Sequence, residues 1–475
     1  MRHIDATISQ MDIFDYTPNS LPLDLKRLDE CWKRFPVYGL LEEMNLERGN
    51  GRDDNPNLMM MKTLFAGMLL GLPNTSVMAR VLGVSNSLRE WVGLRDFRAL
   101  SMGKESPIPQ PNAFTNFMTN LIHHQRDLEA IFNLLRDELA ERIEGFGTEL
   151  AGDGKYFDSY APNRKEDGCK PSDKRGEHDA EYSKKVITYQ SKDGEKKAKT
   201  ETHFGFRKHT LVDVKTELPF ASVLTVASMD EKKAMTELVF PSIPQEYLNE
   251  LISLISYDRG YDATDFLNYL RSYSILPVID KRLMKKRGTV IQYRGNVYYD
   301  DASNFYYLDN SDLDLQDDQV DEDYMSPVIN AITNVSVSLK RMKYEGFDRT
   351  KYKKETPEEL RGALVYSYHG MKTYVYLSDD PRAFNEIARD SDKFKRIYKH
   401  RTAVERYHSR LDSAMMFEQH TIRGLGKMKM LTTLADTVIL TCAKTHLDLG
   451  QTNYSSIFDF GFMPGWNTQE EPSLV

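Results

Sequence analysis

An apolar run of seven residues, Leu251–Tyr257 (LISLISY), ends at Asp258 and restricts what this chain can fold into more than any other segment. Its length and its isoleucine content predict a buried β-strand. An amphipathic helical pattern follows over Thr264–Tyr273, and a second short apolar run covers Ile275–Ile279. Strands that alternate with helices predict a mixed α/β fold, in which functional groups gather at strand ends.

A second acid occupies an equivalent place upstream. Thr148–Ala151 reads as a short strand that ends at Asp153, and Asp153 and Asp258 each lie next to a glycine or one residue from it. A glycine there allows the backbone or a ligand to come close. If the two strands are neighbours, the two carboxylates meet. Taken singly, each Asp is also explained as a turn or cap residue.

The rest of the chain falls into segments of different pattern. Residues 1 to about 140 are predicted to be mostly helical, and Thr75–Trp91 resembles a helix-turn-helix, although an ordinary helical hairpin explains it equally well. The lysine-rich segment from 163 to about 199 is expected to be a loop, followed by strands over His203–Val214 and Leu218–Ala227. Residues 281–376 read as β-rich, and the pattern after Pro381 is helical.

Composition is that of a globular protein of two or three domains, with 475 residues, 40% of them apolar and 28% charged. The net charge of −8 argues mildly against nucleic acid as a partner, but eight acids are concentrated in Asp309–Asp323. Basic runs remain at Lys281–Arg294 and Lys393–Arg410, for which a solvated face is the alternative interpretation.

No membrane partner is expected, because the longest apolar stretch is too short to span a bilayer and no signal-peptide pattern opens the sequence. Cys31, Cys169 and Cys442 lie far apart along the chain. They suggest neither a metal ribbon nor a disulfide framework, so a cytoplasmic location is expected.

Tyr398, Arg401 and Glu405 are spaced by three and four residues, which predicts that they share one face of a helix. An acid among so many basic neighbours suits a metal ligand whose surroundings hold phosphate, while a simple ion pair between Glu405 and Arg401 is the alternative. The basic neighbours are Arg401, Arg406, Arg410, His400 and His408.

Three carboxylates, Asp153, Asp258 and Glu405, would repel one another if they converged without compensation. Two Mg²⁺ ions remove this repulsion, because Mg²⁺ prefers oxygen ligands. A pair of such ions about 4 Å apart can activate a water molecule and stabilise the leaving oxygen of a phosphodiester. The three acids in this order therefore predict a two-metal site for phosphoryl transfer.

Four segments carry a resemblance to a known family: Leu150–Lys155, Phe204–Asp213, Tyr257–Asp262 and Tyr398–Glu405. They resemble insertion-sequence transposases of the DDE type, in the broad IS-four-like group. The order of the predicted elements is similar to a ribonuclease H-like fold. The helical run Leu58–Trp91 is also similar to the domain that precedes the catalytic core in this group.

The resemblance implies that Asp153, Asp258 and Glu405 are the catalytic metal ligands, with two Mg²⁺ ions for which Mn²⁺ can substitute. It implies that Tyr398 and Arg401 contact phosphates of the transposon end. The activity it implies is metal-dependent cleavage of DNA at the element's ends, which carry inverted repeats, followed by transfer of the exposed strand into target DNA. Synapsis of two ends implies a homodimer in the DNA complex, in the cytoplasm of a bacterial or archaeal cell and associated with the nucleoid.

Further DNA-binding and accessory residues are expected around this set. The predicted DNA-binding residues are Tyr398, Arg401, Arg406, Arg410, Lys208, Arg207, Lys285, Lys286 and Arg287. His209 is a possible proton carrier or a structural strand residue. The group often has a lysine seven positions after the Glu, but this chain has Asp412, which either orients His408 or Arg401 or marks a changed site.

The domain organisation expected from these segments has four parts. Residues 1–145 form a helical domain that can bind DNA ends, 146–280 and 381–450 form the ribonuclease H-like core, 281–380 form a β-rich insertion, and 451–475 form a tail. Two other functions fit the same residues. One is a DDE-type nuclease that cuts without integrating, and the other is a catalytically silent DNA-binding relative.

Overall fold

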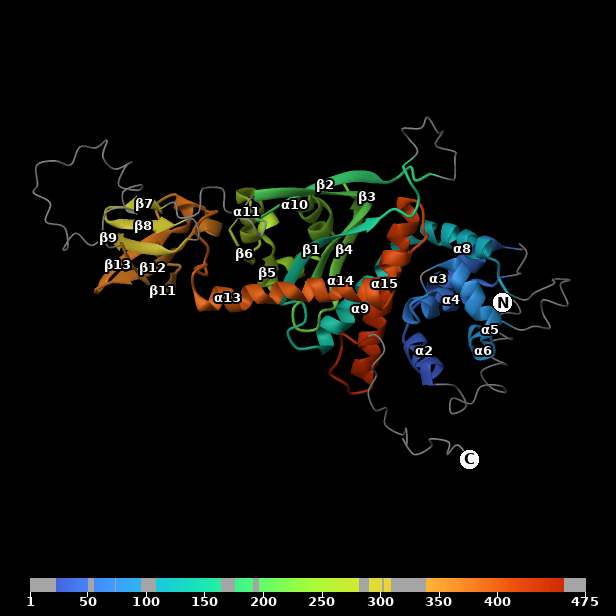
Figure 1. Cartoon of the computed structure of the whole chain (residues 1–475). Helices are drawn as coiled ribbons and strands as arrows, with labels where there is room; N and C mark the ends of the chain where they lie inside the picture. The colour runs from blue at the N-terminus through green and yellow to red at the C-terminus, as the bar shows by residue number, and fades with distance from the viewer. Residues whose placement is uncertain are drawn as a thin grey trace, which may run out of the picture. The chain divides into compact units, whose positions relative to one another are not determined.

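The computed structural model describes residues 23–49, 55–72, 74–94, 108–163, 176–190, 196–281, 290–300, 303–308 and 339–456 (Figure 1). The chain divides into two compact units. Unit 1 comprises Met1–Gly147, Gly154–Asp230 and Val404–Val475, and unit 2 comprises Thr148–Asp153 and Glu231–Ala403. The mixture of helices and sheets confirms the predicted mixed α/β class.

Unit 1 contains the helices expected in the first 140 residues and after Pro381. They are α2 (Leu23–Lys33), α3 (Tyr38–Arg48), α4 (Asn57–Leu69), α5 (Thr75–Val84), α6 (Asn86–Val92), α8 (Pro111–His123), α9 (Gln125–Arg142), α14 (Thr402–Ser413) and α15 (Leu425–Asp448), with a 3₁₀ turn at Phe417–Gln419. Ser85 alone separates α5 from α6, and its hydroxyl accepts from the Leu88 backbone N–H as an N-cap. None of the helices in the described part of the chain has the length and apolar content needed to span a bilayer.

The strands of unit 1 are β2 (Glu181–Gln190), β3 (Lys196–Asp213), β4 (Pro219–Val226) and the second half of β1 (Glu149–Asp158). β3 pairs antiparallel with both β2 and β4. The loop expected from 163 to about 199 is therefore wrong where β2 and the start of β3 lie. The loop prediction followed the lysine-rich composition of this segment, whereas a ten-residue ladder of backbone pairs joins β2 to β3.

Two of the three cysteines meet inside unit 1, although they are distant in sequence. Cys31 in α2 and Cys442 in α15 are both buried, and their Sγ atoms lie 3.8 Å apart as thiols. α15 also packs against α9, α8 and β4, which makes it the central helix of the unit. Long-range packing of this kind has no signature in the spacing of cysteines along a chain.

Unit 2 contains the strand–helix–strand unit predicted from the apolar runs. The first half of β1 pairs parallel with β5 (Leu254–Tyr257), and β5 pairs parallel with β6 (Leu276–Ile279). The helical segments around these strands are α10 (Glu231–Ala234), a π-helix at Met235–Val239, 3₁₀ turns at Phe240–Ser242 and Arg259–Tyr261, a π-helix at Tyr247–Leu251, α11 (Thr264–Ser272), α13 (Asp392–Tyr398) and a 3₁₀ turn at Lys399–Arg401. The strand predicted over Leu251–Tyr257 is shorter than expected, because its first residue belongs to a π-helix.

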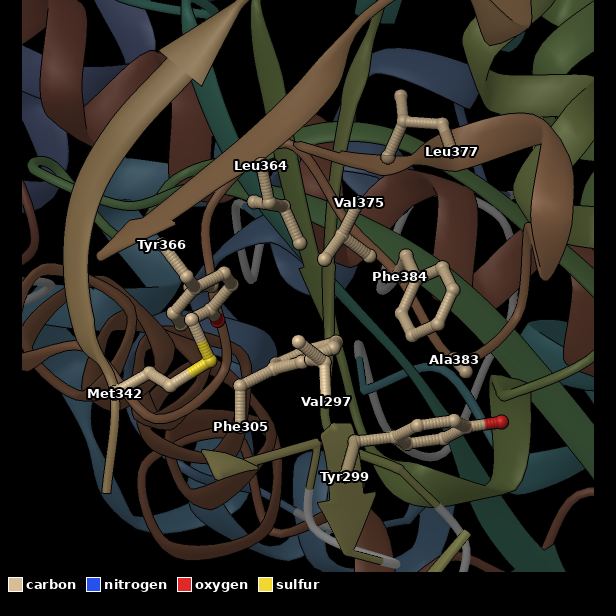
Figure 2. Close-up of a cluster of buried hydrophobic side chains, with 11 residues drawn as sticks. Val297, Tyr299, Phe305, Met342, Leu364, Tyr366, Val375, Leu377, Ala383 and Phe384 are labelled. Carbon is tan, nitrogen blue, oxygen red and sulfur yellow. The ribbon is translucent and has the colours of Figure 1, made fainter. Parts of the chain in front are cut away.

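The β-rich segment of unit 2 forms two small sheets. One is ordered β10-β9-β8-β7 and the other β11-β12-β13. Their strands are β7 (Val290–Arg294), β8 (Val297–Asp300), β9 (Phe305–Leu308), β10 (Leu339–Arg341), β11 (Lys343–Asp348), β12 (Ala363–Tyr368) and β13 (Met371–Tyr376), with a 3₁₀ turn at Glu358–Leu360 and another at Leu377–Asp379. Side chains from both sheets share one core around Phe305 (Figure 2). The acidic run Asp309–Asp323 lies outside the described residues.

Candidate active site

The paired parallel strands β1 and β5 of unit 2 lead toward Asp153 and Asp258. β1 and β5 pair Glu149 with Leu254 and Ala151 with Ser256, a constant offset of 105 positions. Continued two residues beyond its last pair, the same offset leads from Asp153 to Asp258, which directly follows β5. Residues paired in this way point to the same face of a sheet, and neighbouring strands are about 4.8 Å apart. The two carboxylates therefore belong to one edge of unit 2.

The backbone at this point needs a glycine. A Cβ atom on Gly152 would lie 2.1 Å from a ring carbon of Tyr257, so any side chain there would collide with a fully buried ring. Gly152 lets β1 pass close to the end of β5, next to Asp153. The sequence placed Asp153 at the end of its strand, and this is wrong, because β1 continues to Asp158. Beyond Asp153 the strand runs into unit 1, where the Ser159 backbone N–H donates to the Phe204 carbonyl.

Asp258 is held by the turn that follows it. The Gly260 backbone N–H donates to Asp258 Oδ1 over 2.8 Å, which caps the 3₁₀ turn Arg259–Tyr261. A Cβ atom built on Gly260 would lie 2.9 Å from Asp258 Oδ1 and 3.5 Å from Glu231 Oε2. Glu231, the first residue of α10, is thus an acid close to Asp258 that the sequence reasoning missed. Its position in a short helix, away from any recognised motif, gave no signal.

Tyr398 and Arg401 also lie in unit 2, but they do not share a single helix with Glu405 as predicted. Tyr398 ends α13, Arg401 ends a 3₁₀ turn, and Glu405 lies in the first turn of α14. Tyr398 is half-buried, packed on Phe394 with a ring separation of 5.8 Å. Burial raises the pKa of the Tyr398 hydroxyl; Arg401 lowers it, and the negative charges of Asp280 and Asp258 raise it further. Tyr398 is therefore within electrostatic reach of Asp258.

Glu405 belongs to unit 1 and is exposed on α14. The arginines that follow it are engaged with one acid at the β3–β4 turn. Arg410 Nη1 lies 2.6 Å from Glu217 Oε2, and Arg406 pairs with Glu217 Oε1. About half of the Arg406 side chain remains exposed, whereas Arg410 is largely covered. Of these two predicted DNA-binding residues, Arg406 is the more accessible.

The β3 residues predicted to bind DNA are mostly buried in unit 1. The Lys208 Nζ atom lies 2.6 Å from Asp436 Oδ2 of α15, and both side chains are 1% exposed. Burial lowers the pKa of Lys208, although Asp436 acts in the opposite direction. The Arg207 guanidinium lies 4.3 Å from the centre of the Tyr156 ring. Lys208 is thus committed to the interior, a position that a pattern of alternating residues on a strand did not reveal.

The histidines considered as proton carriers are buried as well. His209 is 0% exposed and shares a 3.0 Å hydrogen bond between Nε2 and the Thr225 hydroxyl. Burial lowers the pKa of His209 to about 3, and burial lowers the pKa of His408 to about 3. Both imidazoles are therefore neutral at physiological pH, which suits a structural role better than proton transfer.

Asp412 pairs with a lysine that the sequence reasoning did not select. Lys155 Nζ on β1 lies 2.5 Å from Asp412 Oδ2 on α14, and both side chains are at most one-fifth exposed. Burial raises the pKa of Asp412, while Lys155 lowers it. Alternate residues of a strand share a face, so Lys155 follows Asp153 on the same side of β1. The acid at position 412 is therefore matched by a cation from the strand that carries Asp153.

The remaining predicted residues, Lys285, Lys286 and Arg287, lie outside the described residues. The glycine-rich start of α15 is bound by acids: the Gly424 N–H donates to Glu177 Oε2 and the Leu425 N–H to Asp179 Oδ2.

As a chemical set, Asp153 and Asp258 offer only carboxylate oxygens from one edge of the sheet. This donor chemistry fits a hard divalent cation such as Mg²⁺ or Mn²⁺.

Comparison with known families adds an independent finding. Residues 170–435 match the transposase DDE domain family, and this match spans more than half of the chain. The chain belongs to the transposase DDE domain family. The resemblance to DDE-type insertion-sequence transposases is confirmed, and the matched residues contain Asp258, Tyr398, Arg401 and Glu405 but begin after Asp153. Membership in this transposase family implies DNA as the partner and divalent cations as cofactors. No curated protein and no solved structure matches the chain.

Proposed function

We propose that this chain is a DNA transposase that cleaves phosphodiester bonds at the ends of its element and transfers the exposed 3′-hydroxyl strand into target DNA. Asp153, Asp258 and Glu405 are the proposed catalytic residues and metal ligands. The observation that supports the proposal is the parallel pairing of β1 with β5, whose offset of 105 positions is also the separation of Asp153 from Asp258, in a chain that belongs to the transposase DDE domain family.

The proposed site takes two Mg²⁺ ions, for which Mn²⁺ can substitute. When bound, such ions neutralise charge at the scissile phosphate and raise the reactivity of the attacking oxygen. The protein's part is positioning. The Gly260 N–H fixes the orientation of the Asp258 carboxylate. The close approach of Gly152 to the Tyr257 ring fixes the position of Asp153 relative to β5. A ribonuclease H-like core is the architecture proposed for residues 146–280 and 381–450.

DNA binding is proposed for a set of basic and aromatic side chains. Tyr398 and Arg401 contact end phosphates, and Arg406 supplies an accessible cation on α14. Arg410, Lys285, Lys286 and Arg287 are further proposed contacts. We assign Arg207, Lys208, His209 and His408 structural roles instead, because they are buried.

The wider organisation is part of the same proposal. Residues 1–145 bind the element's ends, 281–380 form an insertion in the core, and 451–475 form a tail. Two copies assemble on a pair of inverted-repeat ends, since transfer of both ends needs two sites. The protein acts in the cytoplasm of a bacterial or archaeal cell, on the nucleoid.

The test is cleavage of DNA that carries the element's own ends, with Mg²⁺ or Mn²⁺, by the full chain. Asp258→Asn should abolish nicking, because the amide retains the bond from Gly260 but loses the charge that holds a cation. Asp265→Asn is the matched control, an exposed acid in the first turn of α11 that should leave nicking unchanged.

The outcomes separate the rival functions. Nicking followed by joining to target DNA supports the transposase. Nicking without joining supports a nuclease, and end binding by a folded protein without nicking supports a silent DNA-binding relative. Nicking that survives Asp258→Asn would overturn the assignment of the site.

A further inference from the structure

His124 lies at the corner between α8 and α9 and is not one of the proposed catalytic residues. It is the C-cap residue of α8 and the N-cap residue of α9, and its side chain is only 5% exposed. A buried imidazole at a helix corner needs polar partners for both ring nitrogens. The partners here come from two different helices.

Both nitrogens of His124 face carboxylates. Nδ1 lies 3.1 Å from Asp127 Oδ2, one turn further along α9, and Nε2 lies 3.1 Å from Glu47 Oε2 on α3. Glu43 lies one turn before Glu47 on α3, so the two glutamates share a helix face. Three acids thus surround a single imidazole.

The same residues form a set of ligand atoms close enough to share one ion. One donor atom each from Glu43, His124 and Asp127 lies within 4.8 Å of the others. We propose that Glu43, His124 and Asp127 bind a divalent transition-metal ion that fastens α3 to the α8–α9 corner. His124 Nδ1 and one oxygen from each acid are the proposed ligands.

Glu47 has a separate part in this arrangement. A histidine that ligates a metal through one nitrogen commonly donates its other N–H to a carboxylate, which fixes the tautomer and the ring orientation. The contact between His124 Nε2 and Glu47 Oε2 has this geometry. Binding through Nδ1 therefore requires no rearrangement of Nε2.

The balance of charge also favours a cation. Glu43, Glu47 and Asp127 together carry three negative charges, and a protonated His124 would offset one of them. Glu43 and Glu47 are four residues apart on one helix, a spacing at which like charges repel. A divalent ion in place of the Nδ1 proton adds one further positive charge and would halve the excess that remains.

The mixed donor set selects the class of ion. One imidazole nitrogen with two carboxylate oxygens suits Zn²⁺ or Mn²⁺, whereas an oxygen-only set suits Mg²⁺. A hollow of 550 Å³, lined in part by Glu47, His124 and Asn120, adjoins the cluster and leaves room for water ligands. This site shares no residue with the proposed catalytic acids, so it can be tested separately from the proposed function.

The experiment is Zn²⁺ titration calorimetry on the full chain carrying Asp153→Asn and Asp258→Asn, which removes two of the proposed catalytic ligands. We expect one Zn²⁺ to bind each chain. Glu43→Gln should weaken that binding by about tenfold or more, because it removes a ligand. Glu42→Gln, its exposed neighbour on α3, should change the affinity by less than about twofold, as expected for a charge outside the ligand set.

Glu43 is the informative position because it makes no hydrogen bond to His124 in the described part of the chain. If the cluster is only a protonated histidine between two acids, Glu43→Gln leaves Zn²⁺ binding unchanged or no stoichiometric binding exists, and either result overturns the proposal. Thermal unfolding tests whether Glu43→Gln still folds as the parent chain does. Zn²⁺ should raise the midpoint of the parent chain by more than that of Glu43→Gln, whose metal-free midpoint should match the parent's.

Discussion

The interior beneath α15 in unit 1 and the interior around Phe305 in unit 2 are built from different chemistry. In the first, Lys208 of β3 and Ser222 of β4 both bind Asp436 of α15, and the Tyr407 hydroxyl donates to the same carboxylate. The second is an aromatic and aliphatic cluster shared by two small sheets, with Phe305 4.5 Å from the Tyr366 ring centre (Figure 2).

The difference concerns how each interior responds to change. Removing one side chain from a buried charge network strongly lowers the stability of the fold, because the remaining charge is left uncompensated in a medium of low dielectric. An apolar cluster loses stability in proportion to the atoms removed. We therefore expect steep, paired effects in unit 1 and graded effects in unit 2.

The largest effect should follow Lys208→Met. It leaves the Asp436 carboxylate buried without its cation and should lower the free energy of unfolding by about 3–5 kcal/mol. Urea unfolding of the full chain measures this. The double variant Lys208→Met/Asp436→Leu should be more stable than the single variant, because both charges are gone. A single-variant loss below about 1 kcal/mol would mean that the network does not hold β3 to α15.

Acid should weaken unit 1 through its buried histidines. Burial lowers the pKa of His408, and that of His209, to about 3, so the unfolded chain binds more protons between its ordinary value near 6.5 and 3. The free energy of unfolding has its full value above pH 6.5. It falls as the pH is lowered towards 3, by about 1.4 kcal/mol per pH unit for each histidine. Urea unfolding at pH 7, 6 and 5 should show this slope. His408→Gln should reduce it, and the exposed His123→Gln should not.

A smaller, graded effect is expected in unit 2. Phe305→Leu keeps the site apolar but removes part of the ring that packs on Tyr366, and should cost about 1–2 kcal/mol. Hydrogen exchange of β8, β9 and β12 would report the loss locally, with unit 1 peptides as the internal control. An all-or-none loss of protection throughout the chain would contradict the graded response.

The smallest effect should come from Tyr366→Phe. The Tyr366 hydroxyl lies 3.2 Å from Asp390 Oδ1, at the edge of the same cluster, and the ring is retained in the variant. The expected loss is about 1 kcal/mol, the net value of one hydrogen bond. Hydrogen exchange of β12 is again the measurement. A loss as large as that of Lys208→Met would show that unit 2 also depends on polar contacts.

The sequence predicted the elements that have a strong periodic pattern. The helices of the first 140 residues, the strands β4 to β6 and the β-rich segment follow from apolar spacing, since burial of one face leaves that spacing in the sequence. β2 was predicted as a loop because of its lysines, although it contains the β-branched run Val186–Thr188 (VIT) and pairs with β3 over ten residues.

The proposed site was accessible from sequence only in part. Asp153 and Asp258 were predicted because each follows a predicted strand and lies near a glycine. The burial of Lys208 was not predicted, because it depends on Asp436, which lies 228 positions away in the sequence. The break between Tyr398 and Glu405 was also hidden, since a 3₁₀ turn and an α-helix differ by less than one residue per turn.

The offset of 105 positions between β1 and β5 has a consequence for how this chain tolerates insertions and deletions. The pairing of β1 with β5 sets the place of Asp153 in the chain, whatever the length of the connection between the two strands. A single residue inserted between Leu150 and Asp153 turns the carboxylate to the opposite face, because strand side chains alternate. Insertion scanning should therefore find a window a few codons wide, between Leu150 and Asp153, in which even one extra amino acid abolishes nicking.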